Sequence, residues 1–119
     1  MENLSSLENL NTFLWDNKKN VIVLYFGASW CGPCKKLKAR LNDLNEMKDF
    51  KNISVGYIDV DDDTNKEIFE IYEVTGLPTQ IFIRMDDNKV IVMDTLIGFD
   101  WTGFKFKYNE CINTIINLN

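Results

Sequence analysis

The sequence contains no histidine, and only three of its 119 residues are cysteine. A structural zinc site usually takes four cysteine or histidine ligands, so this chain cannot supply one alone, and we expect no metal site. Three cysteines are also too few for the disulfide framework of a small secreted domain. Their scarcity favours a reducing compartment, and we expect the protein to be intracellular.

Long apolar runs and an excess of basic residues are missing as well. No run approaches the roughly 20 apolar residues that span a membrane, and residues 1–6 lack the basic and apolar regions of a signal peptide. The net charge of −5 at pH 7 comes without a basic patch, which speaks against nucleic-acid binding. With 45% hydrophobic residues and no linker or repeat, the sequence predicts a single cytoplasmic domain over residues 1–119.

One stretch places two cysteines directly after the apolar run 21–26. It reads Trp30-Cys31-Gly32-Pro33-Cys34-Lys35. Pro33 suits the first turn of a helix, where its missing N–H costs nothing. A helix N-terminus lowers the pKa of a thiol, so we expect Cys31 to be exposed and acidified, with Cys34 roughly one turn on and more buried. Gly32 has no side chain to block an approaching partner.

Such a pair can exchange with a disulfide. The first thiol attacks a substrate disulfide, and the second attacks the mixed disulfide that forms. The alternatives are two structural thiols or half of a zinc site, but the lack of further ligands favours the redox interpretation.

The rest of the chain alternates between helical and strand-like patterns. Apolar spacing predicts helices over residues 6–16, 34–48 and 104–118, and a further helix from the aspartates 61–63 and Thr64 to about Tyr72. It predicts strands over residues 21–26, 53–60, 79–84 and 90–93, whereas a strand at 2–4 has little support. Capping-box patterns place helix N-caps at Ser5 and Thr64. This order predicts an α/β fold with a central mixed sheet of four to five strands and helices on both faces.

The sequence resembles the thioredoxins over most of its length. The matching segments are Tyr25-Phe26-Gly27-Ala28-Ser29-Trp30-Cys31-Gly32-Pro33-Cys34-Lys35 and Tyr72-Glu73-Val74-Thr75-Gly76-Leu77-Pro78-Thr79, which contain both prolines of the chain. The resemblance implies the thioredoxin fold, with Cys31 as nucleophile and Cys34 as resolving thiol. It also implies a redox-active Cys31–Cys34 disulfide and no bound cofactor.

The resemblance assigns supporting roles to further residues of the site. It implies a cis peptide bond before Pro78, which would expose the backbone of Leu77 for strand-like pairing with a substrate. The supporting residues are Trp30, Gly32, Pro33, Lys35, Gly76, Leu77, Pro78 and Gly98, with Trp30 beside the thiols and Gly76 and Gly98 along the substrate groove. The alternatives are a core position for Trp30, a trans turn at Pro78 and a backbone-only role for the two glycines.

Three positions depart from the thioredoxin pattern. Tyr25 replaces a buried aspartate that is thought to deprotonate the resolving thiol, and Tyr57 replaces the lysine that partners it. Replacing both members of a buried charge pair together avoids leaving one buried charge without its partner, which would destabilise the fold. A tyrosine with a pKa of about 10 is a poor base near neutral pH, so we expect Cys34 to be activated by water or its local surroundings. Gly27 stands where an aromatic residue is common.

These features predict a thiol–disulfide oxidoreductase, a protein-disulfide reductase of cell redox homeostasis and electron transport. The resemblance implies disulfide-bearing protein substrates and an NADPH-dependent thioredoxin reductase as electron donor; we expect a monomer. The alternatives are a binding or assembly module that does not use its thiols, and a more oxidising oxidase or isomerase. Cys111 is expected in the core, with a surface regulatory thiol as the alternative.

Overall fold

The computed structural model describes residues 1–118 and, at Asn45, the backbone alone. In chain order its elements are β1 (Glu2–Leu4), α1 (Leu7–Asp16), β2 (Val21–Gly27), α2 (Gly32–Asn42), β3 (Ile53–Asp59), α3 (Lys66–Ile71), β4 (Thr79–Asp86), β5 (Lys89–Ile97) and α4 (Trp101–Leu118). Short 3₁₀ turns follow α2 at Leu44–Glu46 and precede α3 at Asp63–Asn65.

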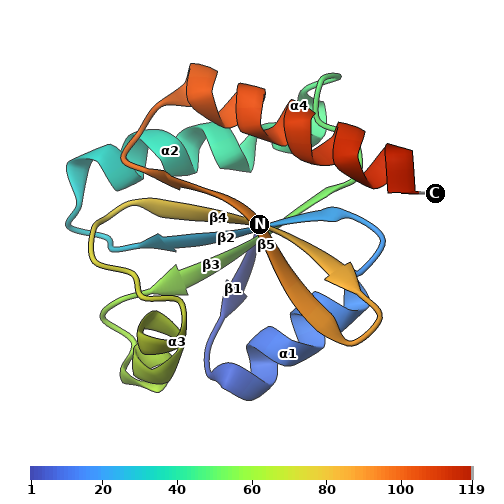
Figure 1. The fold of residues 1–119 in the computed structure, drawn as a ribbon. Coiled ribbons are helices and arrows are strands. Elements are labelled where there is room, and N and C mark those ends of the chain that lie inside the picture. Colours follow the sequence, from blue (N-terminus) through green and yellow to red (C-terminus); the bar gives the residue numbers. More distant parts are fainter. Residues whose placement is uncertain (119) are drawn as a thin grey trace.

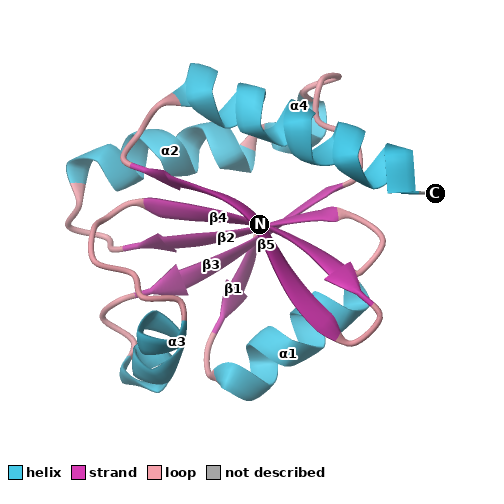
Figure 2. Ribbon diagram, in the orientation of Figure 1, coloured by secondary structure: helices cyan, strands magenta, loops and turns pink. Residues whose placement is uncertain are grey.

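The five strands form one mixed sheet in the order β1-β3-β2-β4-β5. Strands β1 and β2 run parallel to β3, whereas β4 is antiparallel to both β2 and β5. Helices α2 and α4 cover one face of the sheet, and α1 and α3 cover the other (Figures 1 and 2). The predicted α/β fold, with a mixed sheet between two helical layers, is therefore confirmed.

The central strand β2 contributes to a separate core on each side of the sheet. All seven of its residues are buried, because β3 and β4 flank it and helices cover both its faces. Its odd-numbered residues pack with α2 and α4: Val21, Val23 and Tyr25. Its even-numbered residues pack with α1 and α3: Ile22, Leu24 and Phe26. The alternation follows from the two-residue period of a strand, and the unbroken apolar run predicted this strand to within one residue.

Both predicted N-caps are wrong: another serine caps α1, and at α3 a side chain caps the preceding 3₁₀ turn and not the helix itself. At α1 the cap is Ser6, whose hydroxyl accepts a hydrogen bond from the Asn9 N–H at 3.3 Å. A contact across the fold supports this choice, since the Ser6 N–H donates to Oδ1 of Asn65 at 3.0 Å. Ahead of α3, the carboxylate of Asp62 accepts from the Thr64 N–H at 3.0 Å, and the helix begins only at Lys66.

Several element boundaries also differ from the predictions. Helix α2 begins at Gly32 and ends at Asn42, and the apolar spacing continues into the following 3₁₀ turn, which is why a single longer helix was predicted. Strand β5 is longer than predicted because it pairs with β4 from Lys89 to Ile97 through a register shift. Helix α4 begins at Trp101 rather than at residue 104, and β1 is a true strand beside β3.

Candidate active site

The paired cysteines lie at the junction between β2 and α2. Cys31 is the N-cap of α2, and its sulfur accepts a hydrogen bond from the Cys34 N–H at 3.3 Å. The two residues form a disulfide, with their Cα atoms 5.2 Å apart, and Pro33 occupies the first turn as predicted. The prediction of an exposed Cys31 is wrong, because its sulfur turns back onto this first turn. Cys31 is 7% exposed and Cys34 1%, so Cys31 is still the more accessible of the two.

A shallow pocket of about 400 Å³ adjoins the disulfide on the Cys31 side. Backbone and side chains of the segment from Val74 to Leu77 form one wall of this pocket. Its other lining residues are Trp30, Cys31, Val60 and Phe69. Cys34 is not among the lining residues, so a molecule in this pocket meets Cys31 before Cys34. The mostly apolar lining suits an uncharged segment of a partner.

Trp30 stands at the rim of this pocket, with 66% of its surface exposed. Its indole N–H donates to Oδ2 of Asp61 at 2.8 Å. The alternative of a core position for Trp30 is therefore wrong. Sequence reasoning missed Asp61, although a signal was available. Trp30 and Asp61 follow β2 and β3, and the ends of two neighbouring parallel strands meet at one edge of a sheet.

The segment before β4 faces the cysteines with a cis peptide bond between Leu77 and Pro78, as predicted. Pro78 is buried, and its carbonyl accepts a hydrogen bond from the Gly98 N–H at 2.8 Å. The hydroxyl of Thr79 donates to the Gly76 carbonyl at 2.6 Å. Gly98 has a φ of +92°, which glycine adopts most readily. Gly76 lines the pocket, whereas Gly98 is not among the lining residues and supports Pro78 from behind.

Three further predicted site residues lie exposed on the first turn of α2: Gly32, Pro33 and Lys35. A side chain added at Gly32 would meet no heavy atom of the described residues within 4 Å. The surface beside the disulfide is therefore open to an approaching partner.

The comparisons with known proteins agree with this geometry. The family model of the thioredoxins matches residues 3–96, which include both sequence motifs. This chain belongs to the thioredoxin family. It is 37% identical to a thioredoxin of Ictalurus punctatus over 107 residues, which cover 87% of this chain and 94% of that protein.

Two further matches show how far the similarity extends. A protein disulfide-isomerase of Schizosaccharomyces pombe is 30% identical over 125 residues, covering 98% of this chain, but the chain spans only 34% of the isomerase. The X-ray structure of Fasciola hepatica thioredoxin superimposes with a TM-score of 0.78 at 29% identity, over 92% of this chain and 98% of that one. The fold, the family and the bonded cysteine pair together establish thiol–disulfide oxidoreduction as the chemistry, with the chain's own disulfide as redox group.

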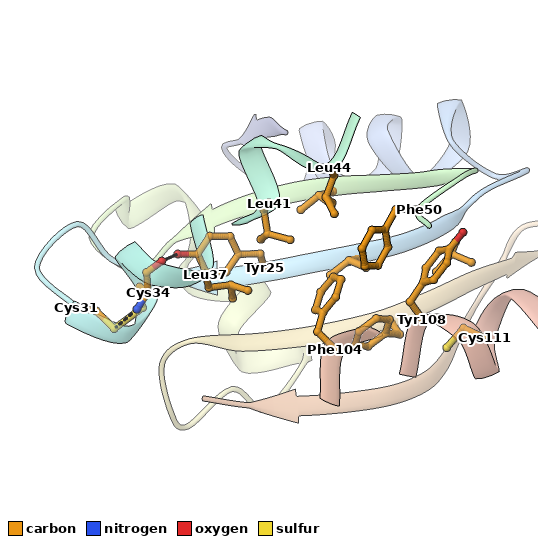
Figure 3. Packing of buried hydrophobic residues seen from close by; sticks show 14 of the residues in the cluster. Tyr25, Cys31, Cys34, Leu37, Leu41, Leu44, Phe50, Phe104, Tyr108 and Cys111 are labelled. Carbon is orange, nitrogen blue, oxygen red and sulfur yellow. Dashed lines mark hydrogen bonds between the residues drawn. A yellow bond between two sulfur atoms is a disulfide. The ribbon is translucent and has the colours of Figure 1, made fainter. Parts of the chain in front are cut away.

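Beneath the thioredoxin motif, Tyr25 takes the place of the expected buried acid. Its hydroxyl donates to the Cys34 carbonyl at 2.9 Å (Figure 3). Its ring centroid lies 4.9 Å from that of Tyr57. Burial, with smaller contributions from Tyr57 and Asp59, raises the pKa of Tyr25 far above its ordinary value of 10.0. Burial and the nearby Asp59 and Asp61 raise the pKa of Tyr57 to about 12. Both phenols are therefore neutral near pH 7.

The third cysteine, Cys111, is a free thiol in the core, as predicted. It lies on α4 at the opposite end of the cluster from the disulfide, with Phe104 and Tyr108 between them (Figure 3). Burial, reinforced by Asp94 and Glu110, raises the pKa of its thiol to about 11. This thiol is protonated near neutral pH and takes no part in the site.

The described part of the chain holds neither a metal-binding cluster nor a membrane-spanning helix. Within residues 1–118, no group of three or more histidine, cysteine, aspartate or glutamate side chains could hold a metal ion. None of the helices found there is both long and apolar enough to cross a bilayer.

Proposed function

We propose that this thioredoxin-family chain reduces protein disulfides through the dithiol form of Cys31 and Cys34. The Cys31 thiolate attacks one sulfur of the substrate disulfide, and the other substrate sulfur leaves as a thiolate that takes up a proton. Cys34 then attacks the sulfur of Cys31, which closes the disulfide of the chain and releases the second substrate thiol. The observation that carries this order of events is that Cys31, and not Cys34, lines the pocket.

The position of Cys31 at the N-cap of α2 supports its role as the nucleophile. The free N–H groups and dipole of the helix favour a thiolate there in the reduced protein. The N–H of Cys34, which contacts this sulfur in the disulfide form, is available as one such donor. Lys35 and Lys36 on the same turn add positive charge nearby.

The segment at Leu77 supports binding of an extended substrate. No backbone hydrogen bond within residues 1–118 engages the N–H or C=O of Leu77, and β4 begins only at Thr79. An extended chain could pair with Leu77 by strand addition, with a side chain in the pocket beside Cys31. Trp30, Gly76 and Pro78 would then shape the two ends of this groove.

Membership of the thioredoxin family supports a proposal for the cellular setting. Electrons for the dithiol would come from an NADPH-dependent thioredoxin reductase or an equivalent donor. The chain would act as a single-domain monomer in the cytoplasm, in electron transport and cell redox homeostasis. Its substrates would be proteins with accessible disulfides.

Insulin disulfide reduction, driven by dithiothreitol, tests this function. Cys31→Ser should abolish the catalysed rate. Reduced Cys34→Ser, freed of dithiothreitol and then mixed with insulin, should stop at a mixed disulfide that is visible on a non-reducing gel. Cys111→Ser is the matched control and should retain the rate. If the unaltered chain reduces insulin no faster than dithiothreitol alone, the result would contradict the proposal and favour a binding module.

Equilibration of the oxidised chain with dithiothreitol buffers gives the direction of electron flow. A reduction potential near −270 mV, the value of thioredoxin, supports a reductant. A potential between about −180 and −120 mV would instead favour an isomerase or an oxidase.

A further inference from the structure

A row of polar side chains crosses the sheet beneath the first turn of α2. Tyr57 on β3, Tyr25 on β2 and Gln80 on β4 are direct register partners, so they face the same side of the sheet. Gln80 is fully buried, and its amide nitrogen donates to the carbonyls of Leu96 and Gly98 at 3.2 Å each. The row therefore contains two phenols and an amide but no carboxylate.

Tyr25 connects this row to the active-site helix. Its side chain is 1% exposed, and its hydroxyl donates a buried 2.9 Å hydrogen bond to the carbonyl of Cys34 (Figure 3). This contact holds the backbone of the residue whose thiol must attack Cys31. A neutral phenol can orient that residue but is too weak a base to take its proton near neutral pH.

The absence of a side chain at Gly27 leaves room for the phenol of Tyr25. A Cβ atom at Gly27 would lie 2.8 Å from Cε1 and 2.9 Å from the hydroxyl oxygen of Tyr25, closer than real atoms approach. The phenol thus occupies the space of a side chain two residues further along the same face of β2. Tyr25 and Gly27, which both depart from the thioredoxin pattern, form one matched arrangement.

We propose that Tyr25 is a positioning residue for the resolving step, and that the Cys34 thiol gives its proton to solvent rather than to a buried side chain. This inference rests on the proposed roles of Cys31 and Cys34. Water or hydroxide takes the Cys34 proton, and the thiolate forms a bond to the Cys31 sulfur. The bond between Cys31 and the substrate breaks, and the substrate sulfur leaves with both electrons of that bond.

Several titratable or charged groups lie on α2 beside Cys34 or interact with the two tyrosines beneath it. They are Tyr25 on β2, Tyr57 and Asp59 on β3, Asp61 after β3, and Lys35 and Lys38 on α2. Asp61 is exposed and accepts the hydrogen bond of the Trp30 indole, so Asp59 is the carboxylate to test as a base instead of solvent. It is the register partner of Gly27, and its charge raises the pKa values of both tyrosines. Any test has to include it.

The resolving step can be measured by mixing reduced protein, in excess, with 5,5′-dithiobis(2-nitrobenzoate) in a stopped-flow instrument. Attack by Cys31 releases one coloured thiolate, and resolution by Cys34 releases the second. Cys34→Ser should show the first phase alone. The proposed function requires that the unaltered chain shows both phases and that Cys31→Ser loses the first. The inference about Tyr25 concerns the second phase alone.

Tyr25→Phe preserves the ring and removes the hydroxyl. We expect the second phase to slow about fivefold, the effect of one neutral hydrogen bond, with an unchanged first phase and an unchanged midpoint in its pH profile. Tyr25→Asp should accelerate the second phase at pH 7 by at least about tenfold and add a titration at lower pH, because it supplies a general base. Asp59→Asn should leave both phases unchanged.

Each opposite result overturns part of the proposal. An unaltered second phase in Tyr25→Phe would remove the positioning role. A shifted pH midpoint in Tyr25→Phe, or a slower second phase in Asp59→Asn, would show that a protein group accepts the proton. Urea unfolding of each oxidised variant establishes that it is folded. Tyr25→Phe and Asp59→Asn decide the question even where Tyr25→Asp does not fold.

Discussion

Replacing Gly27 with alanine should destabilise the protein, although alanine normally improves a strand. The new methyl group would lie 2.8–3.0 Å from three atoms of the Tyr25 side chain, two in its ring and the hydroxyl oxygen. That ring is 1% exposed and tied to the Cys34 carbonyl, so it can move only by disturbing the core and losing its hydrogen bond.

The size of the effect follows from three contributions. Overpacking a core costs about 1–3 kcal/mol, and the lost hydrogen bond costs about 1 kcal/mol. Removing a glycine from the unfolded chain returns roughly 0.5–1 kcal/mol. We therefore expect the free energy of unfolding to fall by about 2 kcal/mol, which corresponds to a Tm lower by roughly 8 °C in a domain of this size.

Urea unfolding of the oxidised protein, followed by circular dichroism, measures this change. Gly32→Ala is the matched control and should change the stability little, since a Cβ atom there meets no neighbour. In a Tyr25→Leu background, Gly27→Ala should lower the free energy of unfolding by less than about 0.5 kcal/mol. The coupling energy between the two positions is then about 1–2 kcal/mol, which lies within the usual range for residues in contact. An equal cost in both backgrounds would refute the steric argument.

Three further changes test other parts of the structure. Asn65→Ala should lower the free energy of unfolding by about 2–4 kcal/mol, because the fully buried amide bonds the Ser6 N–H and two backbone carbonyls; the exposed Asn109→Ala should change it little in the same urea titration. The free energy of unfolding should fall as the pH rises from about 9 toward 11, because unfolded chains release the Cys111 proton that the folded protein retains to about pH 11. Cys111→Ala should flatten the early part of this plot of unfolding free energy against pH. Asp61→Asn should alter the unfolding free energy by less than about 1 kcal/mol, because its contact with Trp30 is exposed, while raising KM for insulin.

Much of the fold was predictable because local patterns and tertiary structure agree. The unbroken apolar run at residues 21–26 could be stable only as an inner strand, and it is the middle strand of the sheet. The two motifs placed the disulfide and the cis peptide bond before Pro78 correctly. Chemistry that needs a fixed spacing along the chain is visible in a sequence.

The errors arose where contacts between distant segments decide the outcome. Ser5 and Ser6 are equivalent as N-cap candidates by residue type, and Asn65, 59 residues away, favours Ser6 by accepting its N–H. The partnership between Trp30 and Asp61 likewise depends on the register of two strands. The fit between Tyr25 and Gly27 became visible only when the direction of the phenol was known.

The alternation along β2 has a consequence for how this protein can change over evolution. Its odd-numbered side chains belong to the core that contains the disulfide and residues of α2, while its even-numbered ones belong to the core on the opposite side of the sheet. Ile22 and Leu24 can therefore be substituted together with their neighbours on α1 and α3 while the surroundings of the disulfide stay intact. Selection on redox behaviour would act on the odd-numbered positions of β2, such as Val23 and Tyr25. Residues of the same strand that stabilise the fold and residues that surround the disulfide can therefore be substituted independently of each other.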